Sequence, residues 1–202
     1  NRVNKGVESS HKDVRHLTLE YPPSSFDYVS LLDPFVKLRS FLVLNCNPFD
    51  ASLRKLYHQL INLRMLSFRA NHSKIPKEIG KLIHLRYLSL EHNCELIEFP
   101  EALCDLCNLQ TLNIRRCYNL RKLPHGMGKL INLRHLQNKD TINLRFMPKA
   151  MERLTCLQTL EVVSLVEKGA EGIETETSFR LADIGKLNRL RGSLYILRLG
   201  DV

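Results

Sequence analysis

Leu63-Arg64-Met65-Leu66-Ser67-Phe68 is repeated as Leu85-Arg86-Tyr87-Leu88-Ser89-Leu90. The pattern returns as Leu109-Gln110-Thr111-Leu112-Asn113-Ile114, as Leu133-Arg134-His135-Leu136, and as Leu157-Gln158-Thr159-Leu160-Glu161-Val162. From Leu85 onward each copy begins 24 residues after the one before it. A fixed period of this length indicates a solenoid, in which each repeat is one structural unit that buries its apolar face against its neighbours.

The repeat extends beyond these copies in both directions. Leu38-Arg39-Ser40-Phe41-Leu42-Val43 lies 25 residues before Leu63, and Val14-Arg15-His16-Leu17-Thr18-Leu19 lies 24 residues before that. Leu190-Arg191-Gly192-Ser193-Leu194-Tyr195-Ile196 begins 33 residues after Leu157, so this interval contains an insertion. We predict one array of about eight repeats over residues 14–202, with residues 1–13 as a lead-in from a preceding domain. The acidic, glycine-containing stretch at residues 166–177 is predicted to be an inserted loop.

A second feature, a proline that follows an apolar residue, recurs in the same phase. It is found at Pro76, Pro100, Pro124 and Pro148. Because proline fixes φ near −65° and has no N–H, it suits the entry to a helical turn. Each unit is therefore predicted to contain a short strand, a turn and a helix or 3₁₀ segment. Stacked units of this kind form a curved α/β solenoid, with a parallel sheet on the concave face and short helical segments on the convex face.

The strand pattern predicts which side chains face outward. Because side chains alternate along a strand, Leu88 and Leu90 are expected in the core while Tyr87, Ser89 and Glu91 face a partner. The same alternation in four repeats gives the candidate partner-binding strand face: Met65, Ser67, Arg69, Tyr87, Ser89, Glu91, Thr111, Asn113, Arg115, His135, Gln137 and Lys139.

A small polar residue or a cysteine recurs in the turn after each strand. It is found at Cys46, Asn71, Asn93, Cys117 and Thr141. A buried side chain of this kind is tolerated when it is hydrogen-bonded, here to the backbone of neighbouring turns. Asn138 instead takes a position where a third core aliphatic belongs, which predicts a weakened or shifted strand at that point.

No pattern in the chain predicts catalysis. Cys104 and Cys107 form a C-x-x-C pair, but a structural zinc site needs further ligands at matching spacing, and neither a second C-x-x-C nor H-x-x-x-H is present. Both cysteines fall on the returning helical segment, so we expect them in or near the core. The chain also lacks a phosphate-binding G-x-x-x-x-G-K-[ST] loop and a G-x-S-x-G motif. We therefore expect no enzyme activity, metal or cofactor in this chain.

Positive charge is the most suggestive polar feature. The net charge is +9, and an arginine takes the same repeat position in five units: Arg15, Arg39, Arg64, Arg86 and Arg134. Stacking aligns these side chains in a stripe, which is either a solvated face or a docking surface for an acidic protein. Arg15, Arg39, Arg64 and Arg86 are our candidates for intramolecular docking.

Nucleic acid is disfavoured as a partner because no nucleic-acid-binding motif is present. There is also no apolar run of about 18 residues, so we expect no membrane span.

Four segments together carry a resemblance to a family. They are D-V-R-H-L-T-L at residues 13–19, I-P-K-E-I-G-K-L-I-H-L-R-Y-L-S-L at 75–90, L-P-H-G-M-G-K-L-I-N-L-R-H-L at 123–136 and L-N-R-L-R-G-S-L-Y-I at 187–196. The chain thereby resembles the leucine-rich-repeat domain of plant intracellular nucleotide-binding, leucine-rich-repeat (NLR) disease resistance proteins of the coiled-coil type. The fold implied by this resemblance is the leucine-rich-repeat horseshoe.

The resemblance also implies a function. In this family the repeat domain senses pathogen effectors, or host proteins that effectors modify, and it autoinhibits the nucleotide-binding switch in the defence response. ADP and ATP belong to that switch module, which this chain lacks, and the implied location is cytoplasmic or shared between cytoplasm and nucleus. The array ends on an apolar strand without a polar cap, so we expect a truncated C-terminal end.

Two other readings remain open on the residues alone. A cytosolic leucine-rich-repeat signalling scaffold without a nucleotide switch has similar repeats, although its step is stricter than the uneven spacing found here. A secreted or receptor-kinase ectodomain typically carries L-x-G-x-I-P, which is absent from this sequence.

Overall fold

The computed structural model describes residues 13–21, 27–46, 50–70, 73–145, 147–165 and 178–197. Apart from Asp13, the expected lead-in lies outside these ranges, as do the acidic insertion at 166–177, Asn71, and the end of the chain beyond residue 197. Within the described residues, no helix combines the length and the apolarity needed to cross a membrane.

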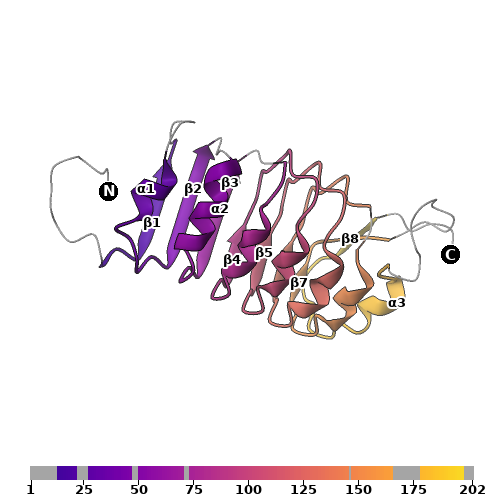
Figure 1. Cartoon of the computed structure of the whole chain (residues 1–202). Helices are drawn as coiled ribbons and strands as arrows, with labels where there is room; N and C mark the ends of the chain where they lie inside the picture. Colours follow the sequence, from indigo (N-terminus) through magenta and orange to yellow (C-terminus); the bar gives the residue numbers. More distant parts are fainter. Residues whose placement is uncertain are drawn as a thin grey trace.

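The expected parallel sheet is present and follows the order of the sequence. Seven strands pair in the order β1 to β7 (Figure 1). Their bounds are β1 His16–Glu20, β2 Ser40–Cys46, β3 Met65–Ala70, β4 Tyr87–Ser89, β5 Thr111–Asn113, β6 His135–Gln137 and β7 Thr159–Leu160. Two further strands, β8 (Val162–Ser164) and β9 (Tyr195–Leu197), form a separate parallel pair. The α/β solenoid predicted from the repeats is therefore confirmed.

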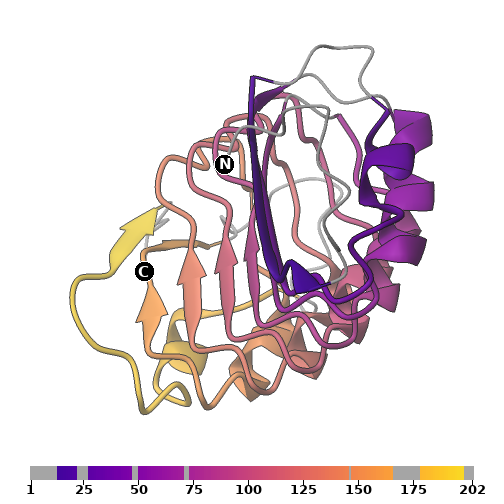
Figure 2. The ribbon, with the colours of Figure 1, turned by 90° about the vertical axis from the view of Figure 1, so that its left-hand side faces the viewer.

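Short helical segments cover the convex side. Viewed along the stack, the sheet lies on one side of the coil and the helical segments on the other (Figure 2). The segments are α1 (Tyr28–Leu32), α2 (Asp50–Gln59), η2 (Lys77–Lys81), η3 (Glu101–Asp105), η4 (His125–Lys129), η5 (Lys149–Arg153) and α3 (Leu181–Ile184). Pro76, Pro100, Pro124 and Pro148 take the N-cap positions of the four 3₁₀ helices, with φ between −68° and −59°. The proline prediction is thereby confirmed.

The periodic leucines form one continuous core. Leu85, Leu88 and Leu90 are at most 1% exposed, and their equivalents in the other central repeats are buried in the same way. Parallel pairing places Leu66, Leu88 and Leu112 side by side. Since each leucine contacts the preceding and the following repeat, burial of apolar surface stabilises the stack as a whole rather than single units.

The hydrogen bonds predicted from the turn position to a neighbouring repeat are confirmed at Asn93 and Cys117, whereas Thr141 bonds within its own turn. The Asn93 side chain donates to the carbonyl groups of Phe68 (2.9 Å) and Leu90 (2.6 Å). In the next two repeats the Cys117 thiol donates to Leu90 O (3.2 Å) and the Thr141 hydroxyl to Asn138 O (2.8 Å). These bonds satisfy the turn backbone at the buried edge of the sheet.

Asn138 marks the place where the seven-stranded sheet gives way to the β8–β9 pair. Its side chain is fully buried, donates to Val162 O (2.7 Å) and accepts from Val162 N–H (3.1 Å). The amide group therefore takes the place of a backbone pair between adjacent repeats. β6 itself keeps the length and register of β5, so the predicted weakening or shift of that strand is not found; the irregularity comes one repeat later, where β8 leaves the seven-stranded sheet.

Candidate protein-binding surfaces

The concave face carries side chains from successive strands in register. Parallel pairing aligns Met65 with Tyr87, Tyr87 with Thr111, and Thr111 with His135. All four are half-buried, so part of each side chain remains accessible from the concave side. This row therefore presents a thioether, a phenol, a hydroxyl and an imidazole group at equivalent positions of the repeat.

The second concave row is less accessible than the sequence suggests. Ser67 and Gln137 are half-buried, but Ser89 is only 5% exposed and Asn113 only 4%. The Asn113 amide donates to Glu91 Oε2 (3.2 Å), and its oxygen accepts from Arg115 N–H (3.1 Å). Asn113 is therefore bonded within the fold, and both Ser89 and Asn113 offer a partner little surface.

The third row contains the charged residues Arg69, Glu91, Arg115 and Lys139. Arg69 and Lys139 are exposed, whereas Arg115 is tied to Glu161, two repeats further along, by an ion pair in which Arg115 Nε lies 3.0 Å from each carboxylate oxygen. The Glu161 carboxylate also accepts from Lys139 N–H at 3.0 Å. One candidate cation is therefore already paired within the fold.

Electrostatics fix the ionised form of this pair. Burial acts to raise the pKa of Glu161, but the hydrogen bonds from Arg115 and from Lys139 N–H outweigh it and lower the pKa below its usual value. The hydrogen bond to Glu161 correspondingly raises the pKa of Arg115. Sequence reasoning missed Glu161, although it stands 24 residues after Gln137 and the repeat period alone identifies it as a concave position.

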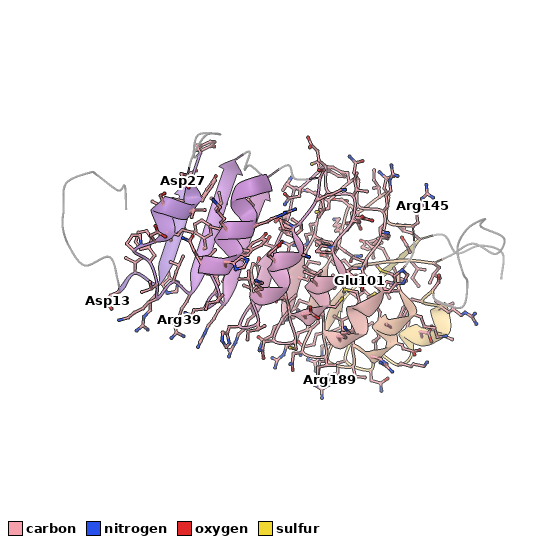
Figure 3. All side chains as sticks on the ribbon, in the orientation of Figure 1. Asp13, Asp27, Arg39, Glu101, Arg145 and Arg189 are labelled. Carbon is pink, nitrogen blue, oxygen red and sulfur yellow. The ribbon has the colours of Figure 1, made fainter. Side chains whose placement is uncertain are left out.

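The predicted arginine stripe exists along the edge where the chain enters the strands. Backbone bonds of 2.8 Å link equivalent residues: Arg39 N–H donates to Arg15 O, Arg64 N–H to Arg39 O, and Arg86 N–H to Arg64 O. The ladder continues through Gln110 to Arg134. Arg39 is half-buried and the other arginines are exposed. Figure 3 shows nitrogen-tipped side chains along this edge between the labelled Arg39 and Arg189, with Arg145 at the opposite edge.

The C-x-x-C pair is divided between the core and the surface. Cys104 is 1% exposed, and burial raises the pKa of its thiol to about 12. Cys107 is exposed, which corrects the expectation that both lie in or near the core. Its position in the repeat is that of Ile83 and Ile131, whose side chains also point outward. Among the described residues, no group of three His, Cys, Asp or Glu is placed to hold a metal ion.

Comparison with known proteins identifies the repeat. The family model of the leucine-rich repeat region matches residues 23–197. The chain belongs to the leucine-rich repeat family. This family assignment confirms the horseshoe expected from the sequence.

Relatives and solved structures agree with this assignment. RPP13-like protein 4, a disease resistance protein of Arabidopsis thaliana, is 39% identical over 79 residues, which is 37% of this chain and 9% of that protein. A second disease resistance protein of the same plant is 41% identical over 69 residues, 34% of this chain and 5% of that protein. The chain thus spans under a tenth of the length of these relatives. The solved structure of a leucine-rich repeat protein of Leptospira interrogans matches with a TM-score of 0.70 and 26% identity, covering 95% of this chain and 44% of that one.

Proposed function

We propose that this leucine-rich repeat chain is the protein-interaction domain of a plant NLR immune receptor. In this role its concave face binds a pathogen effector, or a host protein that an effector has modified. Its early repeats contact a nucleotide-binding module and keep that module inactive. The module, and not this chain, binds ADP or ATP, and the receptor lies in the cytoplasm. The proposal is supported by the identity to disease resistance proteins over parts of the chain. That identity also favours a receptor over a signalling scaffold without a nucleotide switch.

One observation on the concave face carries the sensing role. Met65, Tyr87, Thr111 and His135 stand in register and differ in size and polarity, while the leucine that follows each of them is fully buried. Because side chains alternate across the strand, a change at an outward position leaves the core intact. Partner specificity can therefore vary on this face without loss of the fold.

The arginine row supports the docking role. Arg15, Arg64 and Arg86 are exposed, Arg39 is half-buried, and none of the four forms an ion pair with another described residue. Unpaired guanidinium groups in a row are complementary to an acidic protein face. An effector shifts the switch only if the receptor binds it more tightly in the released state than in the docked state.

Charge reversal in the receptor that carries this chain tests the docking role. We expect Arg64→Glu with Arg86→Glu to weaken the docked state and to give cell death in leaves without an effector. Arg121→Glu changes an exposed arginine that lies outside the arginine row. It serves as the control and should leave the resting state silent. A double variant that accumulates normally and stays silent without effector would contradict autoinhibition through these residues.

A further inference from the structure

The turns that lead into the strands have the same geometry in seven consecutive repeats. In each turn the N–H of the leucine that opens the strand motif donates to the carbonyl three residues earlier, as from Leu63 to Leu60 at 2.9 Å. The other bonds, from 2.8 to 3.1 Å, are Leu38–Phe35, Leu85–Leu82, Leu109–Leu106, Leu133–Leu130, Leu157–Leu154 and Leu190–Leu187. Because all seven turns have the same length, equivalent side chains form continuous rows along this strand-entry edge.

The first row on the strand-entry edge is cationic. It consists of Arg15, Arg39, Arg64, Arg86, Arg134 and Arg191, with Gln110 and Gln158 at the equivalent positions of two repeats. Five of the six arginines are exposed, and none forms an ion pair within the described part of the chain. The fold therefore presents a line of guanidinium groups whose hydrogen-bond donors are available to an external anion.

The second row on the same edge is aliphatic. Val36, Ile61, Ile83 and Ile131 occupy the same position in their turns and are 62%, 48%, 49% and 57% exposed. Side-chain amides tie neighbouring turns together at 2.8 Å, from Asn108 to Ile83 O and from Asn132 to Cys107 O. The aliphatic side chains therefore stand out from a braced edge in four of the seven turns, and Cys107, Thr155 and Asn188 take this position in the other three.

A cavity lies between the two rows at the N-terminal end of the edge. It has a volume of about 330 Å³, and its lining includes Arg15, Lys37, Arg39 and Arg64 together with Val36. Guanidinium groups bind phosphate oxygens in paired hydrogen bonds, and the adjacent valine is apolar. The cavity thus combines donors for a phosphate group with an apolar wall.

We propose that the strand-entry edge binds an anionic phospholipid surface. The arginine row contacts headgroup phosphates, the cavity seats one headgroup, and the aliphatic row enters the boundary between headgroups and acyl chains. Cations next to exposed aliphatic residues on one face are the pattern of proteins that lie on anionic membranes. The aliphatic residues stand in four separate repeats along the edge rather than in one cluster, which suits a lipid surface better than a single partner side chain or groove. This role goes beyond the proposed function and uses arginines that the docked state would cover, so it belongs to the undocked chain; the isolated 202-residue chain tests it without the receptor.

Tryptophan fluorescence gives the most direct readout, because the chain contains no tryptophan. In the Ile83→Trp variant we expect the emission to shift to shorter wavelength with phosphatidylcholine vesicles that contain phosphatidylserine, and to stay unchanged with phosphatidylcholine alone. Ile142→Trp is the matched control, since Ile142 is 64% exposed but lies in the turn after β6, at the opposite edge. Absence of a shift in Ile83→Trp, or an equal shift in both variants, would overturn the proposal.

Vesicle sedimentation tests the arginine row. Each cation near an anionic membrane raises the affinity for the membrane roughly fivefold. Because Arg64→Glu with Arg86→Glu removes two cations and adds two anions, it should weaken vesicle binding by about a hundredfold or more. Lys74→Glu with Arg121→Glu makes the same change of net charge beyond the strand-entry edge and should weaken binding far less. Equal losses in the two variants would show attraction by net charge alone and would overturn the assigned site.

The aliphatic row separates a lipid surface from an acidic protein. Ile61→Ser with Ile131→Ser should weaken vesicle binding and leave the binding of a polyglutamate peptide unchanged, because only the membrane receives the aliphatic side chains. A soluble headgroup, glycerophosphoserine, should compete weakly with vesicles. If the chain binds polyglutamate tightly and vesicle binding is insensitive to the isoleucine changes, the edge is a surface for acidic proteins and the lipid proposal is wrong.

Discussion

At the scale of single residues, Glu161 links three repeats of the concave face. Its carboxylate pairs with Arg115 from two repeats earlier and accepts from the backbone N–H of Lys139 in the repeat between them. The Glu161 side chain is 16% exposed, so solvent screens these interactions only in part. One carboxylate therefore braces the sheet close to the place where β7 ends and β8 begins.

The acid stability of the chain should depend on Glu161. Burial opposes ionisation, but the bonds from Arg115 and Lys139 N–H hold the pKa of the folded state below the ordinary 4.5. This contribution is therefore present above about pH 4.5 and is lost as the pH falls through the lower folded pKa. In urea unfolding we expect Glu161→Gln to be less stable than wild type by about 1–2 kcal/mol at pH 7, with the difference shrinking below pH 4.5.

Glu95→Gln is the control for this pH experiment, because Glu95 is exposed and forms no ion pair with another described residue. Its stability should follow the wild-type curve across the whole pH range. A Glu161→Gln curve that runs parallel to wild type from pH 7 to pH 3 would show that the ion pair contributes nothing to folding.

Two residues show what the sequence leaves open at this scale. The repeat pattern identified Asn138 as irregular, but not the pair of bonds to Val162 that makes a buried amide tolerable. Cys107 was expected in or near the core because it lies on the returning helical segment. The structure exposes it because its turn position belongs to the aliphatic row of the strand-entry edge. The period of the sequence predicts where a residue lies in its repeat. Its hydrogen-bond partners and its exposure depend on the side chains of the neighbouring repeat.

At the scale of elements, the 3₁₀ helices pack through matched small and large residues. A methyl group added at Gly128 would lie 2.5 Å from Ala150 O, and one added at Gly80 would lie 2.7 Å from Ala102 O. The equivalent residue in the helix between them is Cys104, and the residue opposite it is Gly126, where an added carbon would meet the cysteine at 3.2 Å. The positions of the prolines predicted where each 3₁₀ helix begins. The fit of a glycine against the alanine or cysteine of the adjacent helix cannot be predicted from the sequence of one repeat, because it depends on two neighbouring repeats.

Gly128→Ala should therefore destabilise the array. The added carbon meets a backbone oxygen that cannot move without shifting η5, so we expect a loss of about 1–3 kcal/mol in the free energy of unfolding. Gly185→Ala is the matched control, since its added carbon reaches Ala182 O at an ordinary 3.4 Å and its φ is −60°. Urea unfolding of both variants measures the difference. Equal stability of the two would show that the close approach of η4 and η5 is relaxed without cost.

At the scale of the whole molecule, the sequence predicted the sheet, its concave placement and the register of the strands. It predicted the accessible surface less well. Ser89 and Asn113 share the outward phase of Tyr87, yet they are only 5% and 4% exposed, and Asn113 is hydrogen-bonded to Glu91 and to Arg115 N–H. The first concave row and the strand-entry edge are therefore two of the surfaces that remain accessible to partners.

The central claim is that the periodic leucines fold the stack while the outward strand positions remain free to bind. Equilibrium unfolding of Leu88→Asp and Tyr87→Ala, adjacent residues of β4, tests it most directly. Leu88 is fully buried, so an unpaired carboxylate there should remove several kcal/mol, comparable with a typical domain stability of roughly 5–15 kcal/mol. Tyr87→Ala should cost about 1 kcal/mol or less and keep the cooperative transition. Two variants that unfold at the same urea concentration would contradict the account.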